Sequence, residues 1–239
     1  NPFEMLDQFG ADVVRWFLLV NTPIWQTKRF DIDGLVEMKK KFFRPLLETY
    51  KFFVLYANID GFDYSEKQIP YAERTELDRW ISSRLQTTVE EVVAQLEKYD
   101  ATKAGKIIQE FIDQDLSNWY IRLSRRRFWK GERGNDKTAA YQTLFEILLT
   151  LSKLIAPFCP FLAEKLYRRL TNAQLTESVH LAEFPKVNRS GQDKALEEKM
   201  SAPRRVVQLG RSLRELKELK VRQPLTKIIV VTEDAAVKK

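Results

Sequence analysis

Apolar residues in the first 60 positions recur at helical spacing in two segments. The first segment, residues 3–20, carries large apolar side chains every three or four positions, at Phe9, Val13, Trp16, Phe17 and Val20. This spacing predicts a helix. A second helix is expected to begin at Asp31 or Asp33, either of which is a suitable N-cap, and to extend to about Asn58. Pro45 lies inside this helix, so we expect a kink there.

Two further helices are predicted in the middle of the chain. Residues 75–78 have the spacing of a capping box, and the helix that follows has Trp80, Leu85 and Val92 on its apolar face. The next helix is expected to extend from about Ala101 to Lys130, with Gly131 as its C-cap. Its core-facing stripe is predicted to contain Ile108, Ile112, Leu116, Tyr120 and Leu123.

The last 100 residues predict more helix and a little strand. Helices are expected from Asp136 to Ile155, from Pro160 to Leu170 and, interrupted by Pro203, from about Gln192 to Lys220. Residues 178–181 and the β-branched run 228–231 read as strands. The predicted fold class is therefore mainly α, a helical bundle with a small α/β C-terminal tail.

The basic character of the chain is concentrated in residues 115–131. If this segment is helical, one arc of roughly 120° holds most of its basic and indole side chains, namely Trp119, Arg122, Arg125, Arg126 and Trp129, together with Arg133 just beyond it. Arginine binds phosphate oxygens in pairs, and flat rings stack on unpaired bases, so the pattern indicates a surface for an RNA loop. The alternative is a solvated basic face whose tryptophans complete a core. The close spacing of like charges favours an acidic partner, because such pairs destabilise a helix by a few tenths of a kcal/mol each.

Composition limits the remaining classes of function. With 44% hydrophobic and 31% charged residues and a net charge of +7, the chain is typical of a soluble globular protein with a polyanionic partner. No apolar run reaches the roughly 18 residues of a membrane span and no signal peptide opens the chain, so we expect no membrane contact. Cys159 is the only cysteine, which suits a reducing compartment and a buried role.

The chain itself offers no catalytic centre. One histidine and one cysteine cannot form a zinc site or a Ser-His-Asp or Cys-His constellation. The single histidine, His180, is interpreted as structural because no carboxylate at useful spacing orients it. The eight glycines have neither the P-loop nor the dinucleotide-binding spacing. We therefore expect no metal and no cofactor in this chain.

Several motifs, in order along nearly the whole chain, resemble class I aminoacyl-tRNA synthetases of the isoleucyl, valyl and leucyl group. Residues 9–17 resemble the segment that follows the signature loop of that group. The run Asn118-Trp119-Tyr120-Ile121-Arg122 and the run Arg125-Arg126-Arg127-Phe128-Trp129 favour isoleucyl-tRNA synthetase over the valyl enzyme. Further similarity to the isoleucyl enzyme lies in residues 115–120, 125–131, 178–185 and 220–225. Lys199-Met200-Ser201 resembles the start of the signature loop, but Ala202-Pro203 follows it, so we assign it no function.

The resemblance implies a C-terminal piece of a ligase that needs ATP with Mg to activate isoleucine and that works in the cytoplasm. Its catalytic and editing domains would lie in the rest of the synthetase chain, because neither domain's signature is present here, and Asn1 as the first residue suggests a fragment. The implied divisions are the end of the stem-contact region (residues 1–30), a helical anticodon-binding domain (31–205) and a C-terminal extension (206–239). The implied partner is tRNA, through the anticodon stem-loop of tRNA-Ile, and the fragment alone would be inactive.

The resemblance also implies which side chains hold the anticodon arm between two helices. Carried over by position, they are Asn118, Trp119, Arg122, Arg125, Arg126, Trp129 and Lys130 on one helix and Lys40, Lys41, Phe43 and Arg44 on the other. Trp119 would stack on a base, while Asn118 and Arg122 would bond base edges or phosphates. Glu48 departs from the pattern, because relatives commonly have Asn there and a carboxylate cannot donate as an amide can.

Two other functions remain open from the residues alone. A stand-alone basic helical adaptor could bind an acidic protein through the arginine face, and it would bind RNA weakly and without regard to a loop. Attachment to anionic lipid is disfavoured, because no helix combines a bulky exposed apolar face with lysines.

Overall fold

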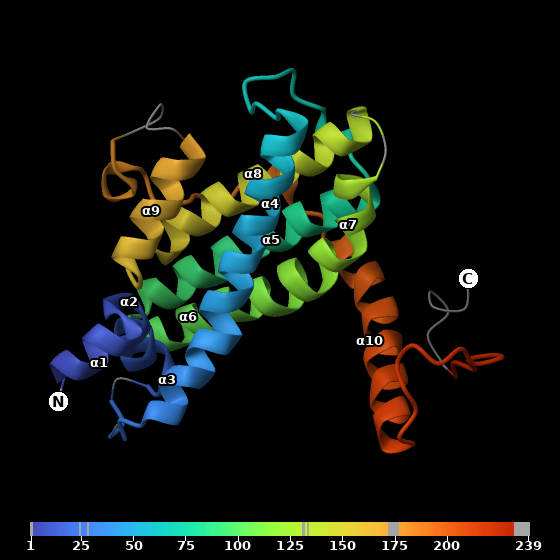
Figure 1. Cartoon of the computed structure of the whole chain (residues 1–239). Coiled ribbons are helices and arrows are strands. Elements are labelled where there is room, and N and C mark those ends of the chain that lie inside the picture. Colours follow the sequence, from blue (N-terminus) through green and yellow to red (C-terminus); the bar gives the residue numbers. More distant parts are fainter. Residues whose placement is uncertain are drawn as a thin grey trace. The chain divides into compact units, whose positions relative to one another are not determined.

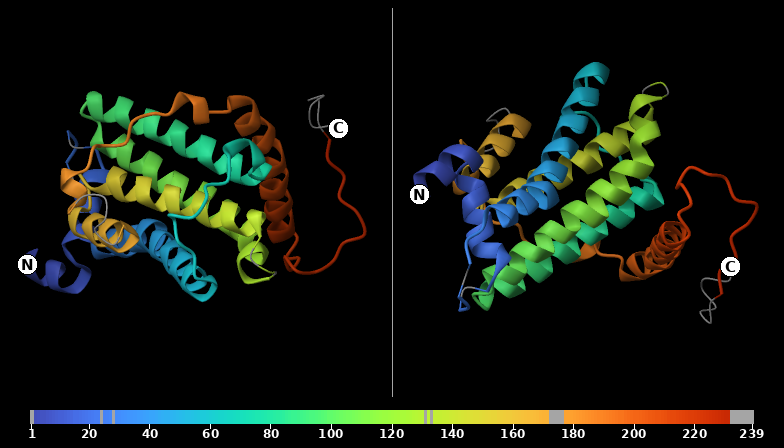
Figure 2. Two further views of the ribbon diagram at one scale, coloured as in Figure 1. Left: turned by 90° about the horizontal axis from the view of Figure 1, so that it is seen from above. Right: turned by 60° about the horizontal axis from the view of Figure 1, so that its bottom comes forward.

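The computed structural model describes residues 2–23, 25–27, 29–130, 132, 134–171 and 177–231. The chain divides into two compact units, residues 1–192 and 193–239. In the first unit the long helices lie side by side as a bundle (Figures 1 and 2). The expected functional boundaries at 30/31 and 205/206 stay predictions. No helix among the described residues is long and apolar enough to cross a membrane.

The predicted N-terminal helix is broken into three elements. They are α1 (Pro2–Phe9), α2 (Ala11–Trp16) and the π-helix η1 (Phe17–Asn21). The break lies at Gly10, whose φ of 84° belongs to a region that only glycine enters readily. The prediction of one continuous helix over residues 3–20 was therefore wrong at this position.

The second predicted helix also consists of successive elements. They are α3 (Ile32–Met38), the π-helix η2 (Lys39–Phe43) and α4 (Arg44–Asp60). Asp31 is the N-cap, since its carboxylate accepts a hydrogen bond from the backbone N–H of Gly34. Pro45 lies in the first turn of α4, directly after the π-helical turns, so the irregularity that we expected at the proline begins just before it.

The two middle helices form an antiparallel pair. Thr75 caps α5 (Glu76–Glu97) by accepting from the N–H of Asp78, as the capping-box spacing predicted. A short turn at Tyr99, with φ of 58°, leads into the predicted helix from Ala101. That helix consists of α6 (Ala101–Glu110), the π-helix η4 (Phe111–Ile121) and α7 (Arg122–Trp129). Gly131, the expected C-cap, lies outside the described residues.

Two more helices complete the first unit. They are α8 (Asn135–Ile155) and α9 (Pro160–Thr171), which pack on each other as the green-yellow to orange ribbons of Figure 1 show. Short 3-10 helices lie between the longer elements: η3 (Tyr71–Glu73), η5 (Val179–Leu181) and η6 (Arg189–Gly191).

The predicted strand at residues 178–181 is wrong, since this segment contains η5. The Ser178 hydroxyl accepts from the N–H of His180, and the Glu164 carboxylate accepts from the N–H of Val179. These local side-chain bonds satisfy the backbone groups that a strand would have paired with a neighbour.

The second unit contains α10 (Lys194–Leu216), which Asp193 caps and which Pro203 does not interrupt. After α10 the chain turns back, and the Arg214 guanidinium donates to the carbonyls of Lys220 and Gln223. The predicted strand at 228–231 is wrong: the four residues are exposed, and no strand is present among the described residues with which they could pair.

Aromatic side chains dominate the core of the first unit. Trp16 of α2 stacks on Phe42 of η2 with ring centroids 3.6 Å apart. The ring centroid of Phe158 lies 5.5 Å from that of Trp16. A second cluster joins α4, α7 and α8, where the Tyr141 ring lies 5.0 Å from that of Phe128. Cys159 is fully buried beside the first cluster, and burial raises the pKa of its thiol, which fits the inert role expected for it.

Gly105 allows α6 and η1 to approach closely. A Cβ added there would lie 2.3 Å from Cγ2 of Val20, which is itself buried and β-branched. Valine has few rotamers with which to move away.

We expect Gly105→Ala to destabilise the first unit by about 1–3 kcal/mol, because overpacking outweighs the gain in helix propensity of about 1 kcal/mol. Gly210→Ala in α10 is the matched control, since a Cβ there lies at an ordinary 3.7 Å from Ile228. It should leave stability unchanged or raise it. Urea unfolding followed by circular dichroism measures both, and equal stability of the two variants would contradict the close approach.

Candidate nucleic-acid interface

The arginine-rich end of the long helix presents most of its predicted residues to solvent. Asn118 on η4 and four basic residues after it are exposed, Trp129 is 56% exposed, and Trp119 is half-buried. The exposed basic residues are Arg122, Arg125, Arg126 and Lys130. Among the described residues, the first three of these form no ion pair with a carboxylate. Arg133, also placed in this arc, lies outside the described residues.

One side chain of the predicted core stripe faces the wrong way. Leu123 is 53% exposed, whereas Ser124 is fully buried. The cause is η4, whose i→i+5 hydrogen bonds fit more residues into each turn than an α-helix does. The core side chains consequently continue in steps of four, at Leu116, Tyr120, Ser124 and Phe128.

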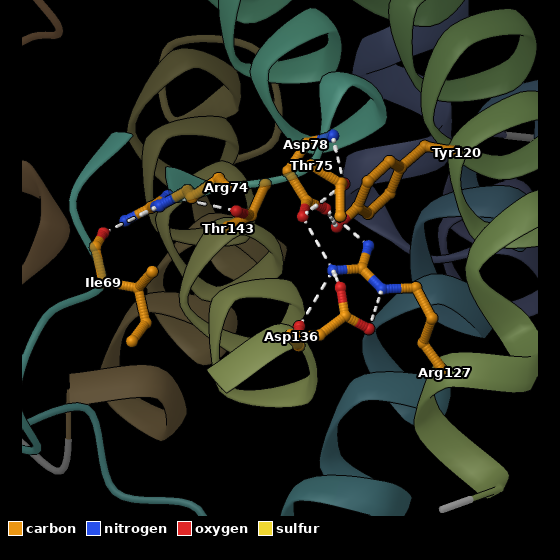
Figure 3. A network of polar contacts seen from close by, with 8 residues as sticks. All are labelled: Ile69, Arg74, Thr75, Asp78, Tyr120, Arg127, Asp136 and Thr143. Carbon is orange, nitrogen blue, oxygen red and sulfur yellow. Dashed lines mark hydrogen bonds and ion pairs between the residues drawn. The ribbon is translucent and has the colours of Figure 1, made fainter. Parts of the chain in front are cut away.

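Arg127, seven residues after the buried Tyr120, also points inward. Its guanidinium pairs with the carboxylate of Asp78 at 2.8 and 2.7 Å and with that of Asp136 at 3.0 and 2.8 Å (Figure 3). Asp78 lies on α5 and is fully buried. Arg127 was not among the site residues named from the sequence, although at 100° per residue it lies on the same stripe as Leu116 and Tyr120.

The facing helix presents its cations but not its aromatic ring. Lys40, Lys41 and Arg44 are exposed. Lys41 donates a hydrogen bond to the Glu37 carboxylate, which raises the pKa of Lys41, so this lysine stays charged. Phe43, by contrast, is 6% exposed, with its ring centroid 6.4 Å from that of Trp16. The structure therefore places Phe43 in the core, where its ring is not available to a nucleotide.

A hollow of about 240 Å³ lies between the two helices. It is lined from α4 by Glu48, Thr49, Lys51, Phe52 and Leu55, and from η4 and α7 by Ser117, Ile121 and Arg125. Glu48 accepts a hydrogen bond from Lys51 at 3.0 Å. Of the predicted residues only Arg125 lines the hollow; Lys51 and Phe52 do so as well, and nothing in the sequence pattern had indicated them.

Asn118, which follows the hollow-lining Ser117 in the sequence, is oriented by a side-chain hydrogen bond. Its amide nitrogen donates to the Asp113 carboxylate at 2.9 Å, and Gln114 donates to the other oxygen of the same carboxylate at 2.6 Å. Because a carboxylate only accepts, the amide carbonyl of Asn118 must point away from Asp113.

The sequence decides what kind of domain this is. Residues 78–230, which include α5, the arginine-rich helix and α10, match the family described as the anticodon-binding domain of tRNA ligase. The chain belongs to this family.

Relatives of this anticodon-binding domain are similar over nearly its whole length. It is 49% identical to the isoleucine–tRNA ligase of Cytophaga hutchinsonii over 96% of this chain and 21% of the relative. It is 48% identical to that of Porphyromonas gingivalis over 98% of this chain and 20% of the relative. The chain thus spans about a fifth of the length of the ligases that it matches.

A solved structure shares the fold of the anticodon-binding domain. This structure is the LeuRS of a ternary LeuRS-tRNA-LeuAMS complex from Agrobacterium radiobacter K84. The match covers 81% of this chain and 21% of the LeuRS chain, with a TM-score of 0.59 and 21% sequence identity. This confirms the predicted helical bundle.

The register of the arginine-rich helix can be tested by two substitutions. Leu123→Ser should cost less than about 0.5 kcal/mol because the side chain is exposed. Ser124→Leu should cost about 1–3 kcal/mol because a larger side chain must enter a filled core. Chemical denaturation of both variants gives the two values, and the opposite order would show that the α-helical register holds.

Proposed function

We propose that this chain is the part of an isoleucine–tRNA ligase that binds the anticodon stem-loop of tRNA-Ile. The observation that carries the proposal is the hollow between α4 and the arginine-rich helix, in a chain of the anticodon-binding family. The hollow is flanked by exposed arginines that form no ion pair within the part of the chain that the structure describes. The names of the relatives support the choice of isoleucine.

The proposed binding uses two kinds of contact. Arg125, Arg126 and Lys130, with Lys40, Lys41 and Arg44 opposite, supply positive charge for the RNA backbone. Such contacts give affinity without identity.

Base recognition needs other side chains. Trp119 is the proposed stacking platform, with Trp129 beside it, and Asn118 and Arg122 are the proposed base-edge contacts. Bases of a single-stranded loop can be splayed out to meet them, unlike those of an A-form stem.

Catalysis is proposed to belong to the rest of the synthetase chain. There ATP with Mg would activate isoleucine in the cytoplasm, as the whole ligases are expected to do. The described residues contain no group of three or more His, Cys, Asp or Glu side chains that could hold a metal ion. Isoleucine-dependent ATP–pyrophosphate exchange by this chain alone would contradict the proposal.

Arg125→Ala should weaken binding of every stem-loop by a similar factor and reduce the slope of log K against log salt by about one. Fluorescence anisotropy with a labelled anticodon stem-loop at several salt concentrations measures both quantities. Arg168→Ala on α9 is the control, since Arg168 is also exposed but does not line the hollow. Equal slopes for Arg125→Ala and the unaltered chain would refute the contact.

Trp119→Ala should cost about 1–3 kcal/mol of stem-loop binding through lost stacking, with an unchanged salt slope. Trp25→Ala is the matched control, because Trp25 is 66% exposed in the N-terminal loop. A stand-alone basic adaptor makes a different prediction, namely that a duplex RNA without a loop competes as well as the stem-loop does.

A further inference from the structure

Arg127 differs from its two neighbours in the arginine run. Arg125 and Arg126 are exposed, whereas the side chain of Arg127 is 17% exposed and points into the bundle (Figure 3). From the sequence, Arg125 and Arg126 were predicted to contact RNA, and Arg127 was not among the predicted site residues.

The guanidinium of Arg127 has little capacity left for another partner. It donates to both carboxylate oxygens of Asp78, to both of Asp136, and to the Asp136 carbonyl at 2.8 Å. A guanidinium has five N–H groups in a fixed plane, so these five contacts occupy nearly all of them.

The Asp78 carboxylate depends on Arg127 for its charge balance. It is fully buried and also accepts from the Tyr120 hydroxyl at 2.7 Å and from the Thr75 hydroxyl at 2.7 Å. Burial raises the pKa of Tyr120 well above its ordinary value, so this hydroxyl remains a neutral donor. Arg127 is thus the cation that pairs directly with this buried carboxylate.

The contact ties together three helices at the place where the binding surface ends. Asp78 belongs to α5, Asp136 to α8 and Arg127 to the last turn of α7. The end of a helix frays unless something holds it. Arg126 and Trp129, which are proposed to face RNA, lie within two residues of this anchor.

We propose that Arg127 is a positioning residue of the anticodon interface: it makes no contact with RNA but fixes the last turn of α7, so that Arg126 and Trp129 project from a rigid helix. This inference rests on the proposed function. Its physical reason is that ordering loosened side chains on binding reduces affinity, whereas a pre-ordered surface avoids that cost.

The test compares Arg127→Lys with Arg126→Lys and Arg126→Met in the full chain. Lysine keeps the charge that a phosphate contact needs but cannot reproduce the two-pronged contact with Asp78. Arg127→Lys also leaves a cation beside the buried carboxylate, so this variant is expected to fold. Stem-loop affinity is measured at several salt concentrations, at a temperature where circular dichroism shows each variant fully folded.

For Arg127→Lys we expect affinity to fall by about 3- to 10-fold with an unchanged salt slope. Arg126→Lys should keep most of the affinity, and Arg126→Met should reduce the slope by about one. A double-mutant cycle adds a second readout: Arg127→Lys combined with Asp78→Asn should lose little more affinity than either change alone.

Two outcomes would overturn the inference. If Arg127→Lys binds like the unaltered chain while Arg127→Met lowers the slope, Arg127 is itself a phosphate contact. If Arg127→Lys lowers only the melting temperature and leaves affinity unchanged, its role is merely structural. Failure of the proposed function is distinguishable from both, because the unaltered chain would then show no preference for the loop.

Discussion

The π-helical turns of η4 are the constraint that decides which side chains of the arginine-rich helix enter the core. The i→i+5 hydrogen bonds of Phe111–Ile121 place more residues in each turn and so rotate everything that follows relative to an α-helical register. This rotation is why Ser124 rather than Leu123 enters the core. Arg122, Arg125 and Arg126 face solvent, as the α-helical wheel had predicted, so the π-helical turns change the core face more than the charge pattern of the surface.

Periodicity and capping chemistry were sufficient to predict the bundle. Thr75 and Asp31 cap the helices that they were expected to cap, because an N-cap needs only a side-chain oxygen and the next turn of the same helix. The buried role of Cys159 followed in the same way from its apolar surroundings. Local signals of this kind are present in the sequence whatever the rest of the chain does.

The predictions that failed depend on distant partners. A strand needs a second strand, and residues 228–231 have none among the described residues. A π-helix forms where tertiary packing favours it, and a polar residue such as Ser124 gives no sign that it will be buried. The exposed cations of the site were predictable from charge, whereas Phe43 was assigned to the RNA surface from the family resemblance and lies in the core.

Buried charge gives the bundle its geometry more than its stability. Asp78 pairs with Arg127, and nearby Arg74 makes a two-pronged contact with Glu146 at 2.8 Å for both bonds. Removing two charges from water costs about as much as their attraction returns, so such pairs add little net free energy of folding. They do penalise any arrangement in which one partner is missing, and they therefore select one position of α7 relative to α5 and α8.

A rigid scaffold matters because a hydrogen bond to a base edge needs a defined direction, whereas attraction to a phosphate does not. Exposed lysines and arginines can follow a moving RNA backbone, since charge attraction depends weakly on angle. An amide such as that of Asn118, held by Asp113, presents its acceptor in one direction only. Glu48, which lines the opposite side of the hollow, can only accept hydrogen bonds. Discrimination at this surface would therefore depend on the groups that the bundle immobilises, and affinity on those that it leaves free.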